Sequence, residues 1–111
     1  MINYSSFVIS MALYMLYHTR ARDDALGILD ELREQFEEIY KEHEVDILGF
    51  WEVEGDRSQA YYMTRYEDEA DYNAKVEGLR NDERYKRLTE KLNEVRVSSE
   101  ATRLTPMWVP E

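Results

Sequence analysis

The segment DILGFWEVEGDRSQAYYMTRY, residues 46–66, is the clearest indication of the fold. It holds two runs of β-forming residues, 46–53 and 59–66, separated by five polar or small residues. Gly55 in this loop can take the positive φ that a tight connection needs. The segment therefore predicts a β-hairpin, and Gly49 within its first run indicates a bulge or a close backbone approach.

Before the hairpin, residues 12–19 (ALYMLYHT) are rich in β-formers and contain no Gly or Pro. This composition favours a strand, in which alternation places Tyr14 and His18 on one face and Tyr17 on the other. Apolar residues then recur at helical spacing over 25–43, which predicts an amphipathic helix. We expect the acidic pair at 23–24 to cap its N-terminus.

After the hairpin, Asp68 and Asp71 have capping-box spacing at the start of a second helical region. The apolar stripe of that region is interrupted at residues 81–82, which predicts two short helices. Residues 98–109 alternate weakly and predict a last strand. We place that strand at the sheet edge because Pro106 lacks an N–H to donate.

The predicted order is strand, helix, strand, strand, helix, strand. This is the ferredoxin-like βαββαβ arrangement of the α+β class, an antiparallel sheet with both helices on one face. Residues 11–111 are expected to form one domain, with residues 1–10 as an N-terminal lead-in. Both faces of the predicted strands carry apolar or aromatic residues, yet two helices cover only one face. We therefore expect the other face to pack on a second copy, giving a homodimer.

Composition excludes several classes of protein. The chain has 111 residues, a formal net charge of −10 and no cysteine. The charge disfavours nucleic acid and anionic membranes, and the lack of cysteine excludes disulfides and thiolate metal sites. The apolar run 7–17 is too short to span a bilayer, and no Lys or Arg precedes it. A cytoplasmic location without membrane association is the expectation.

Several short motifs resemble the NIPSNAP family. They are GFW at 49–51, Gly55, RYED at 65–68, NDERY at 81–85, VSSE at 97–100 and RLTP at 103–106. The sequence departs from the family at Met15, at 20–22 and at Tyr85, where the family often has Arg, Pro-Gly and Trp. The resemblance covers roughly residues 11–108 and implies the dimeric α/β-barrel superfamily, in which two ferredoxin-like sheets pack face to face.

Nine tyrosines and two tryptophans are concentrated in the predicted strands. Such rings offer apolar area with a polar tip, so they suit a pocket for a flat or apolar ligand. Core packing and interface packing are the alternative explanation for the same rings. The predicted substrate-binding residues are Trp51, Tyr17, Tyr62, Tyr66 and Trp108.

His18, Tyr14 and Arg65 are the predicted catalytic residues. A histidine at a strand end suits general acid–base work, and Tyr14 and Arg65 could stabilise a developing enolate or phenolate. The structural alternatives are a surface histidine for His18 and an ion pair for Arg65. The two histidines lie 25 positions apart without a metal-binding pattern, so neither a metal nor another cofactor is expected.

Superfamily relatives catalyse cyclisation, isomerisation and oxygenation. The resemblance and the aromatic residues together favour a cofactor-independent enzyme of the cyclase, isomerase or monooxygenase type. Its substrate would be an apolar, aromatic or polyketide-like molecule from biosynthesis. A non-catalytic ligand-binding module and a module that serves only dimerisation are the alternatives.

Overall fold

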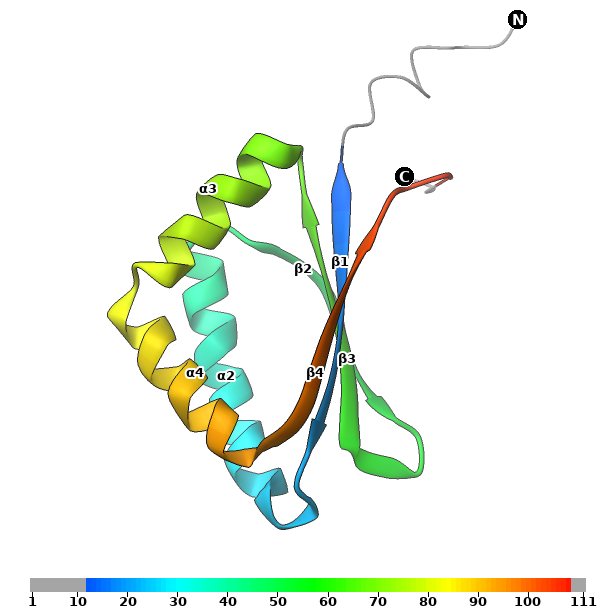
Figure 1. The fold of residues 1–111 in the computed structure, drawn as a ribbon, viewed down its shortest axis with the longest axis vertical. Helices are drawn as coiled ribbons and strands as arrows, with labels where there is room; N and C mark the ends of the chain where they lie inside the picture. The colour runs from blue at the N-terminus through cyan, green and yellow to red at the C-terminus, as the bar shows by residue number, and fades with distance from the viewer. Residues whose placement is uncertain (1–11, 109–111) are drawn as a thin grey trace, which may run out of the picture.

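An antiparallel sheet covered on one face by helices is the architecture of residues 12–108, the part of the chain that the computed structural model describes (Figure 1). The elements are β1 (Leu13–Ala21), the 3₁₀ turn η1 (Asp23–Ala25), α2 (Leu26–Glu42), β2 (Asp46–Val53), β3 (Asp56–Tyr66), α3 (Glu69–Arg80), α4 (Glu83–Val95) and β4 (Arg96–Leu104). The strand order is β2-β3-β1-β4. This confirms the predicted ferredoxin-like α+β fold. The predicted lead-in at 1–10 lies outside the described residues.

The hairpin of β2 and β3 forms where it was predicted, but its connection is shorter. Only Glu54 and Gly55 lie between the strands, and Gly55 has a φ of 85°. The second strand begins at Asp56, three positions earlier than expected, because the Asp56 carboxylate accepts hydrogen bonds from Ser58 and Gln59 and orders these polar residues. A register shift next to Gly49 confirms the predicted bulge.

The first helix differs from the prediction at its N-terminus. The acidic pair at 23–24 does not cap α2 but forms the first turn of η1, and no side chain caps either element. These carboxylates still lie near the positive end of the helical segment. The first strand continues to Ala21, two residues beyond the expected end, where it pairs with Arg96 of β4.

Two helices meet at residues 81–82, as predicted. Asp68 caps α3 by accepting a hydrogen bond from the Asp71 N–H at 2.8 Å, and Asp82 caps α4 through the Arg84 N–H at 2.9 Å. His43 Nε2 lies 2.9 Å from Asp82 Oδ2 and so joins the end of α2 to the start of α4. Hydrogen bonds from Arg84, and then from His43, hold the pKa of Asp82 well below its ordinary range.

The last strand lies at a sheet edge, as expected, but for another reason than the one given. β4 ends at Leu104, so Pro106 is outside the ladder and does not limit it. β4 is an edge strand because it pairs with β1 alone, and β1 in turn pairs with β3 on its other side.

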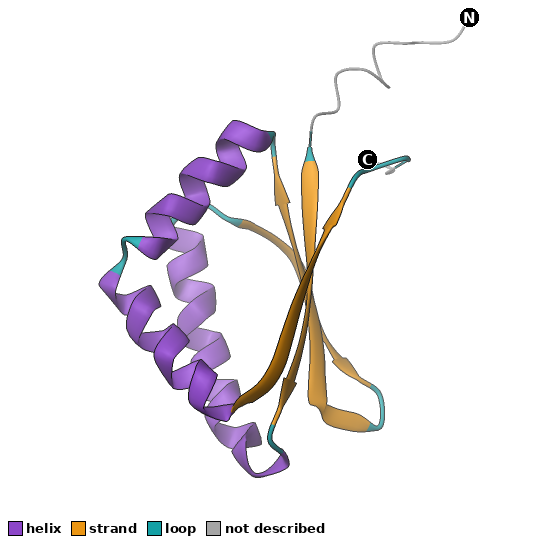
Figure 2. Ribbon diagram, in the orientation of Figure 1, coloured by secondary structure: helices purple, strands orange, loops and turns teal. Residues whose placement is uncertain are grey.

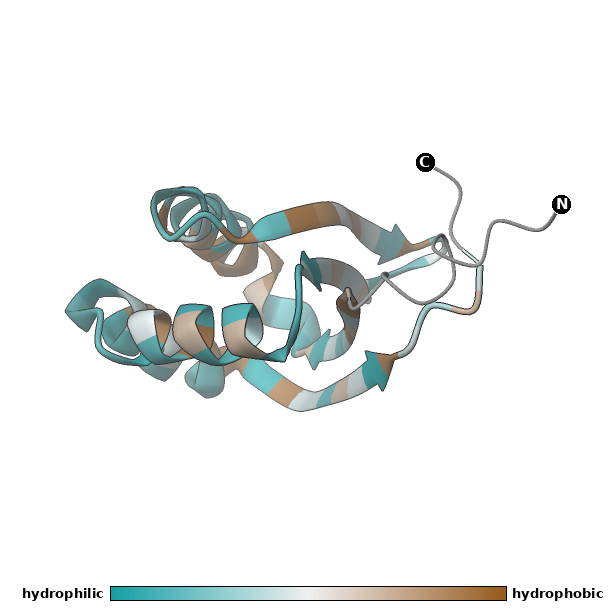
Figure 3. Ribbon diagram, turned by 90° about the horizontal axis from the view of Figure 1, so that it is seen from above, coloured by the Kyte–Doolittle hydropathy of each residue, from teal (hydrophilic) through white to brown (hydrophobic). Residues whose placement is uncertain are grey.

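The helices of residues 12–108 all pack on one face of the sheet, and no element in that range covers the second face (Figure 2). Hydrophobic and hydrophilic residues alternate along both layers, as the view from above shows (Figure 3). Buried side chains between the layers form the core: Leu13, Met15, Ala25, Leu32, Ile39, Val45, Tyr66, Leu79, Leu88 and Val95. We call the covered side the helix face and the other side the open face.

Candidate functional site

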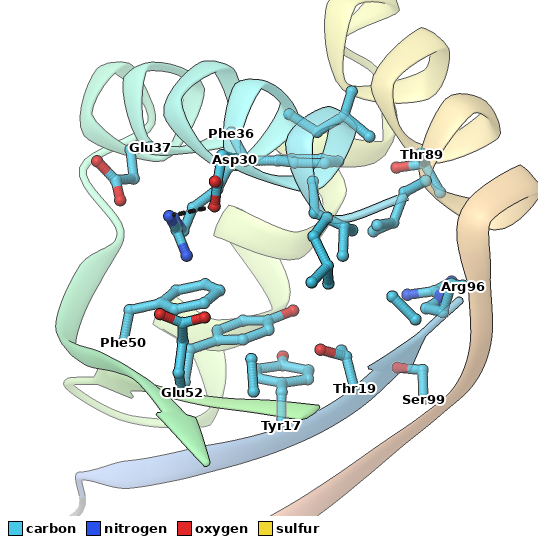
Figure 4. A pocket seen from close by; sticks show the side chains of 18 of the residues that line it. Tyr17, Thr19, Asp30, Phe36, Glu37, Phe50, Glu52, Thr89, Arg96 and Ser99 are labelled. Atoms are coloured by element: carbon cyan, nitrogen blue, oxygen red, sulfur yellow. Dashed lines mark hydrogen bonds and ion pairs between the residues drawn. The ribbon is translucent and has the colours of Figure 1, made fainter. Parts of the chain in front are cut away.

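A cavity of ≈ 310 Å³ lies between the helix face of the sheet and helices α2 and α4. Its floor comes from alternate residues of the strands, and its roof comes from the apolar stripes of the two helices. Figure 4 shows Tyr17, Thr19 and Phe50 rising from the strands toward Phe36 of α2 and Thr89 of α4. We call this space the helix-side cavity. Its volume is at the lower end of the range for small-molecule sites.

Three parallel rings form the floor of the helix-side cavity. Tyr62 of β3 stacks on Tyr17 of β1 with centroids 4.5 Å apart and on Phe50 of β2 with centroids 5.3 Å apart. The interplanar angles are 13° and 3°. The sheet register produces this row, because Tyr62 is the direct partner of both Tyr17 and Phe50. Both faces of Tyr62 are therefore covered by its two neighbours, and the row presents apolar ring edges to the cavity, which suit edge-to-face contact with an aromatic ligand.

One end of the cavity carries a chain of ion pairs. Arg57 contacts Glu52 at 2.9 Å and Asp30 at 3.5 Å. Asp30 also pairs with Arg33 at 2.8 Å, and Figure 4 marks this contact of Asp30 with a dashed line. The Arg33 guanidinium lies over the Phe50 ring, 5.1 Å from its centroid. These contacts connect α2 to the hairpin. The exposed charges mark this end as the one that faces water.

Two charged side chains of the wall form no ion pair within residues 12–108. Glu37 of α2 lines the cavity and forms no ion pair with another residue of 12–108. Arg96 at the start of β4 also lines it, near Ser99 and Thr19, and hydrogen-bonds the side chain of Asn93 (Figure 4). A carboxylate that is free of Arg or Lys can accept a proton from a bound molecule.

The tyrosine hydroxyls at the inner wall are held in their protonated form. Burial is the main cause that raises the pKa of Tyr17 and of Tyr40 far above the ordinary value, and neighbouring tyrosines add to the effect. Burial likewise raises the pKa of Tyr62 to about 12. These groups therefore act at neutral pH as hydrogen-bond donors and not as bases.

Two predicted substrate-binding residues, Tyr17 and Tyr62, line the helix-side cavity. A third, Tyr66, is on the same face of the sheet and lines an adjoining cavity. The structure therefore brings these three residues together.

The remaining predicted residues lie elsewhere. Tyr14, His18, Arg65 and Trp51 are all on the open face, because the register pairs Tyr14 with Arg65 and aligns His18 and Trp51 with the same position of β3. Trp51 is 50% exposed. Trp108 follows β4 and is 79% exposed. The sheet therefore separates these residues from Tyr17, and their roles in binding stay predictions.

Of the three predicted catalytic residues, Tyr14 and Arg65 are cross-strand partners whose side chains interact on the open face, whereas His18 lies apart from them. Tyr14 and His18 lie four positions apart on one strand, which places their Cα atoms ~13 Å apart. His18 stacks on Tyr61 at 4.5 Å and contacts the Gln59 amide oxygen at 2.9 Å. Arg65 pairs with Glu67 at 3.0 Å, the ion pair that was the structural alternative. The catalytic role of these residues stays a prediction.

Several cavity residues were missed from the sequence, among them Phe50, Arg33 and Glu37. Phe50 carried a usable signal, because alternation in 46–53 places it opposite to Trp51. Arg33 and Glu37 looked like solvent-facing positions of an amphipathic helix. They reach the cavity only because of the angle at which α2 crosses the hairpin. That angle cannot be predicted from the local sequence pattern.

The fold and the cavity define the class of this protein: a ferredoxin-like α+β domain with a ligand-sized space between its two layers. Residues 11–108 match the NIPSNAP family, and the chain belongs to that family. No curated protein sequence matches the chain. The predicted family is thereby confirmed.

Solved structures with the same fold come from several bacteria. A NIPSNAP family protein of Agrobacterium tumefaciens has a TM-score of 0.77 and 21% identity, with 86% of each chain covered. An uncharacterized NIPSNAP domain protein of Burkholderia xenovorans has a TM-score of 0.78 and 17% identity, over 89% of this chain and 99% of that one. A putative antibiotic biosynthesis monooxygenase of Bacteroides thetaiotaomicron has a TM-score of 0.71 and 15% identity, over 87% and 90%. At these identities the likeness establishes the fold.

Within residues 12–108, no group of three or more His, Asp or Glu side chains is arranged to hold a metal ion. No helix in that range has the length and apolarity to cross a membrane.

Proposed function

We propose that this NIPSNAP protein binds a flat apolar, aromatic or polyketide-like molecule in the helix-side cavity and acts on it without a cofactor. The observation that carries the proposal is the row of Phe50, Tyr62 and Tyr17 at the cavity floor. A ligand that packs against the edges of this row gains contact with aromatic rings that the sheet already holds in place. Little ordering cost then opposes binding.

The chemistry that fits the cavity is proton transfer next to a carbonyl. Glu37 would take a proton from the bound molecule, and the protonated hydroxyls of Tyr17 and Tyr62 would donate hydrogen bonds to the resulting enolate. Such a step serves cyclases and isomerases, and it prepares an electron-rich carbon for a monooxygenase reaction. The likeness to a putative antibiotic biosynthesis monooxygenase agrees with this class of chemistry at the level of fold.

Binding is tested with 2-ethylnaphthalene, a flat apolar probe, followed by its fluorescence. Ala101 lines the cavity opposite Tyr17, whereas the next residue, Thr102, is on the open face opposite Leu16. We expect Ala101→Phe to fill the cavity and weaken binding about tenfold or more, and Thr102→Phe to leave it unchanged. Equal affinities in the parent and both variants, or no binding to the parent, would refute the helix-side cavity as the site.

Catalysis is tested on a molecule that co-purifies with the protein and is identified by native mass spectrometry. Glu37→Gln should lower kcat about 10²- to 10⁴-fold, and the exposed neighbour Glu38→Gln should not. Unchanged turnover in Glu37→Gln would exclude Glu37 as the catalytic base. In His18→Phe, unchanged turnover would remove the open-face histidine from the mechanism. Binding without turnover in the parent protein would leave a non-catalytic ligand-binding module.

We further propose that the open face packs against the open face of a second copy. Its support is the exposed apolar surface on that side of the sheet, where Trp51 is 50% exposed and Tyr14, Leu16 and Met63 are only partly buried. An isologous contact between two such faces would remove this surface from water. His18 and Arg65 would then lie within the interface.

The oligomeric state is measured by light scattering during size-exclusion chromatography. Ile28 of α2 provides a matched control, since it is also 50% exposed but belongs to the helical layer. We expect a dimer mass for the parent and for Ile28→Glu, and a monomer mass for Trp51→Glu. A monomer mass for the parent at every concentration would end the proposal.

A further inference from the structure

A second cavity of ≈ 230 Å³ adjoins the helix-side cavity beneath α3 and the start of α4. Six tyrosines line it: Tyr17, Tyr40, Tyr62, Tyr66, Tyr72 and Tyr85. We call it the tyrosine chamber. Four of these residues, Tyr17, Tyr40, Tyr62 and Tyr85, also line the helix-side cavity. The two spaces therefore share a wall of phenol groups, and the chamber lies next to the stacked rings of the first site.

Thr64 is the unusual residue of the tyrosine chamber. Its side chain is 2% exposed, and its hydroxyl is the buried side-chain polar atom of the described residues that lacks a hydrogen bond of normal geometry, with the Tyr66 phenol as the polar side chain that interacts with it. Alternation along β3 directs Thr64 to the same face as Tyr62 and Tyr66. A buried hydroxyl without a partner is costly, and a protein rarely keeps one unless something else satisfies it.

The other polar groups of the chamber are nearly all of one kind. Besides Thr64 and the tyrosines, its lining has Arg80 and apolar side chains, and no carboxylate or amide among the described residues. Burial is the main cause that raises the pKa of Tyr66, as it does for Tyr17, Tyr40 and Tyr62, so these phenols keep their protons. The chamber thus offers many donors and no anionic acceptor.

From this arrangement we propose that the tyrosine chamber binds a carbonyl oxygen of the ligand, so that the substrate class is an aryl ketone or quinone. The flat apolar body would pack against the edge of the ring row in the helix-side cavity, and the oxygen would accept hydrogen bonds from Thr64 and the neighbouring phenols. This inference rests on the proposed function and adds the part of the ligand that the stacked rings do not recognise.

Two probes of matched shape test the proposal: 2-acetylnaphthalene has the carbonyl and 2-ethylnaphthalene lacks it. Each is titrated by fluorescence into the parent protein, Thr64→Val and the control Thr102→Val on the open face. We expect the parent to prefer the ketone about tenfold. Thr64→Val should reduce this preference several-fold, and Thr102→Val should keep it. The free Thr64→Val protein should melt no more than slightly below the parent, because its hydroxyl has no hydrogen bond of normal geometry to lose.

Each outcome is decisive. Equal binding of both probes to the parent overturns the carbonyl site but leaves the proposed apolar cavity intact. Failure of both probes overturns the two proposals together. An unchanged preference in Thr64→Val, or a large fall in its melting temperature, shows that the hydroxyl belongs to an internal network or to bound water and overturns its assignment to the ligand.

Discussion

Replacing the central ring of the aromatic row is the sharpest perturbation of the helix-side cavity. Tyr62→Leu keeps an apolar side chain but removes two stacked pairs, those with Tyr17 at 4.5 Å and Phe50 at 5.3 Å. Each such pair contributes about 0.5–1.5 kcal/mol beyond its buried area. The free energy of unfolding should therefore fall by about 1–3 kcal/mol. Urea denaturation followed by circular dichroism measures this loss.

The same substitution should also weaken ligand binding in the helix-side cavity. A probe that packs against the edge of Tyr62 loses one aromatic contact, and 0.5–1.5 kcal/mol corresponds to roughly a 2- to 13-fold rise in Kd. Titration with 2-ethylnaphthalene measures the change. The comparison is made with folded protein at a temperature well below both unfolding midpoints, so that the loss of stability does not enter the affinity.

Tyr61→Leu is the matched control, because Tyr61 is the next residue on β3 and belongs to the open face. It stacks on His18 alone, at 4.5 Å and 20°. Its substitution should lower the free energy of unfolding by about 0.5–1.5 kcal/mol and leave probe affinity unchanged. Repeating the urea titration at tenfold higher protein concentration separates any contribution from self-association. Equal effects of the two substitutions on probe affinity would refute the assignment of the ligand to the helix face.

Three further predictions concern the scaffold. Leu88 is 5% exposed in the core, so Leu88→Ala should lower the free energy of unfolding by about 2–5 kcal/mol in urea titrations. Asp82 has a depressed pKa when folded, so its ionised form stabilises the protein above the unfolded pKa of about 4, and this contribution is lost as the pH falls through the folded value. Asp82→Asn should therefore be less stable than the parent at pH 7, and the difference measured by urea unfolding should shrink below about pH 4; a constant difference would contradict it. At Gly49 an added Cβ would lie 2.5 Å from Cζ2 of Trp51, so Gly49→Ala should displace the indole and change its fluorescence in a Trp108→Phe background, with little loss of stability.

The parts of the fold that the sequence predicted are those fixed by local chemistry. The hairpin with Gly55, the bulge at Gly49 and the N-cap at Asp68 each depend on residues within a few positions of one another. The junction at 81–82 has the same character. The observed start of a strand differed from the predicted one where a side chain hydrogen-bonds a nearby backbone group, as the Asp56 carboxylate does with the Ser58 N–H. The residue type alone does not specify that such a bond forms.

The site was harder to predict, because both faces of the sheet are apolar and aromatic. Alternation already separated Tyr17 from Tyr14 and His18, but it could not say which set the helices cover. That choice depends on the handedness of the strand–helix connection and on helix packing across the sheet. The position of Thr64 in the tyrosine chamber could have been predicted, because alternation places this residue between Tyr62 and Tyr66 on one face of β3.

Charge and cavity chemistry together limit the kind of ligand. The protein carries a formal net charge of −10, which lowers the local concentration of anions and slows their approach. The tyrosine chamber, however, offers donors that need an oxygen acceptor. A neutral molecule with a carbonyl group satisfies both conditions, because it is not repelled at a distance and still accepts hydrogen bonds inside. A carboxylate ligand satisfies only the second. If binding is governed by these two features, affinity for 2-acetylnaphthalene should be insensitive to salt, whereas affinity for 2-naphthoate, its anionic counterpart, should be weaker at low ionic strength and rise as salt screens the repulsion.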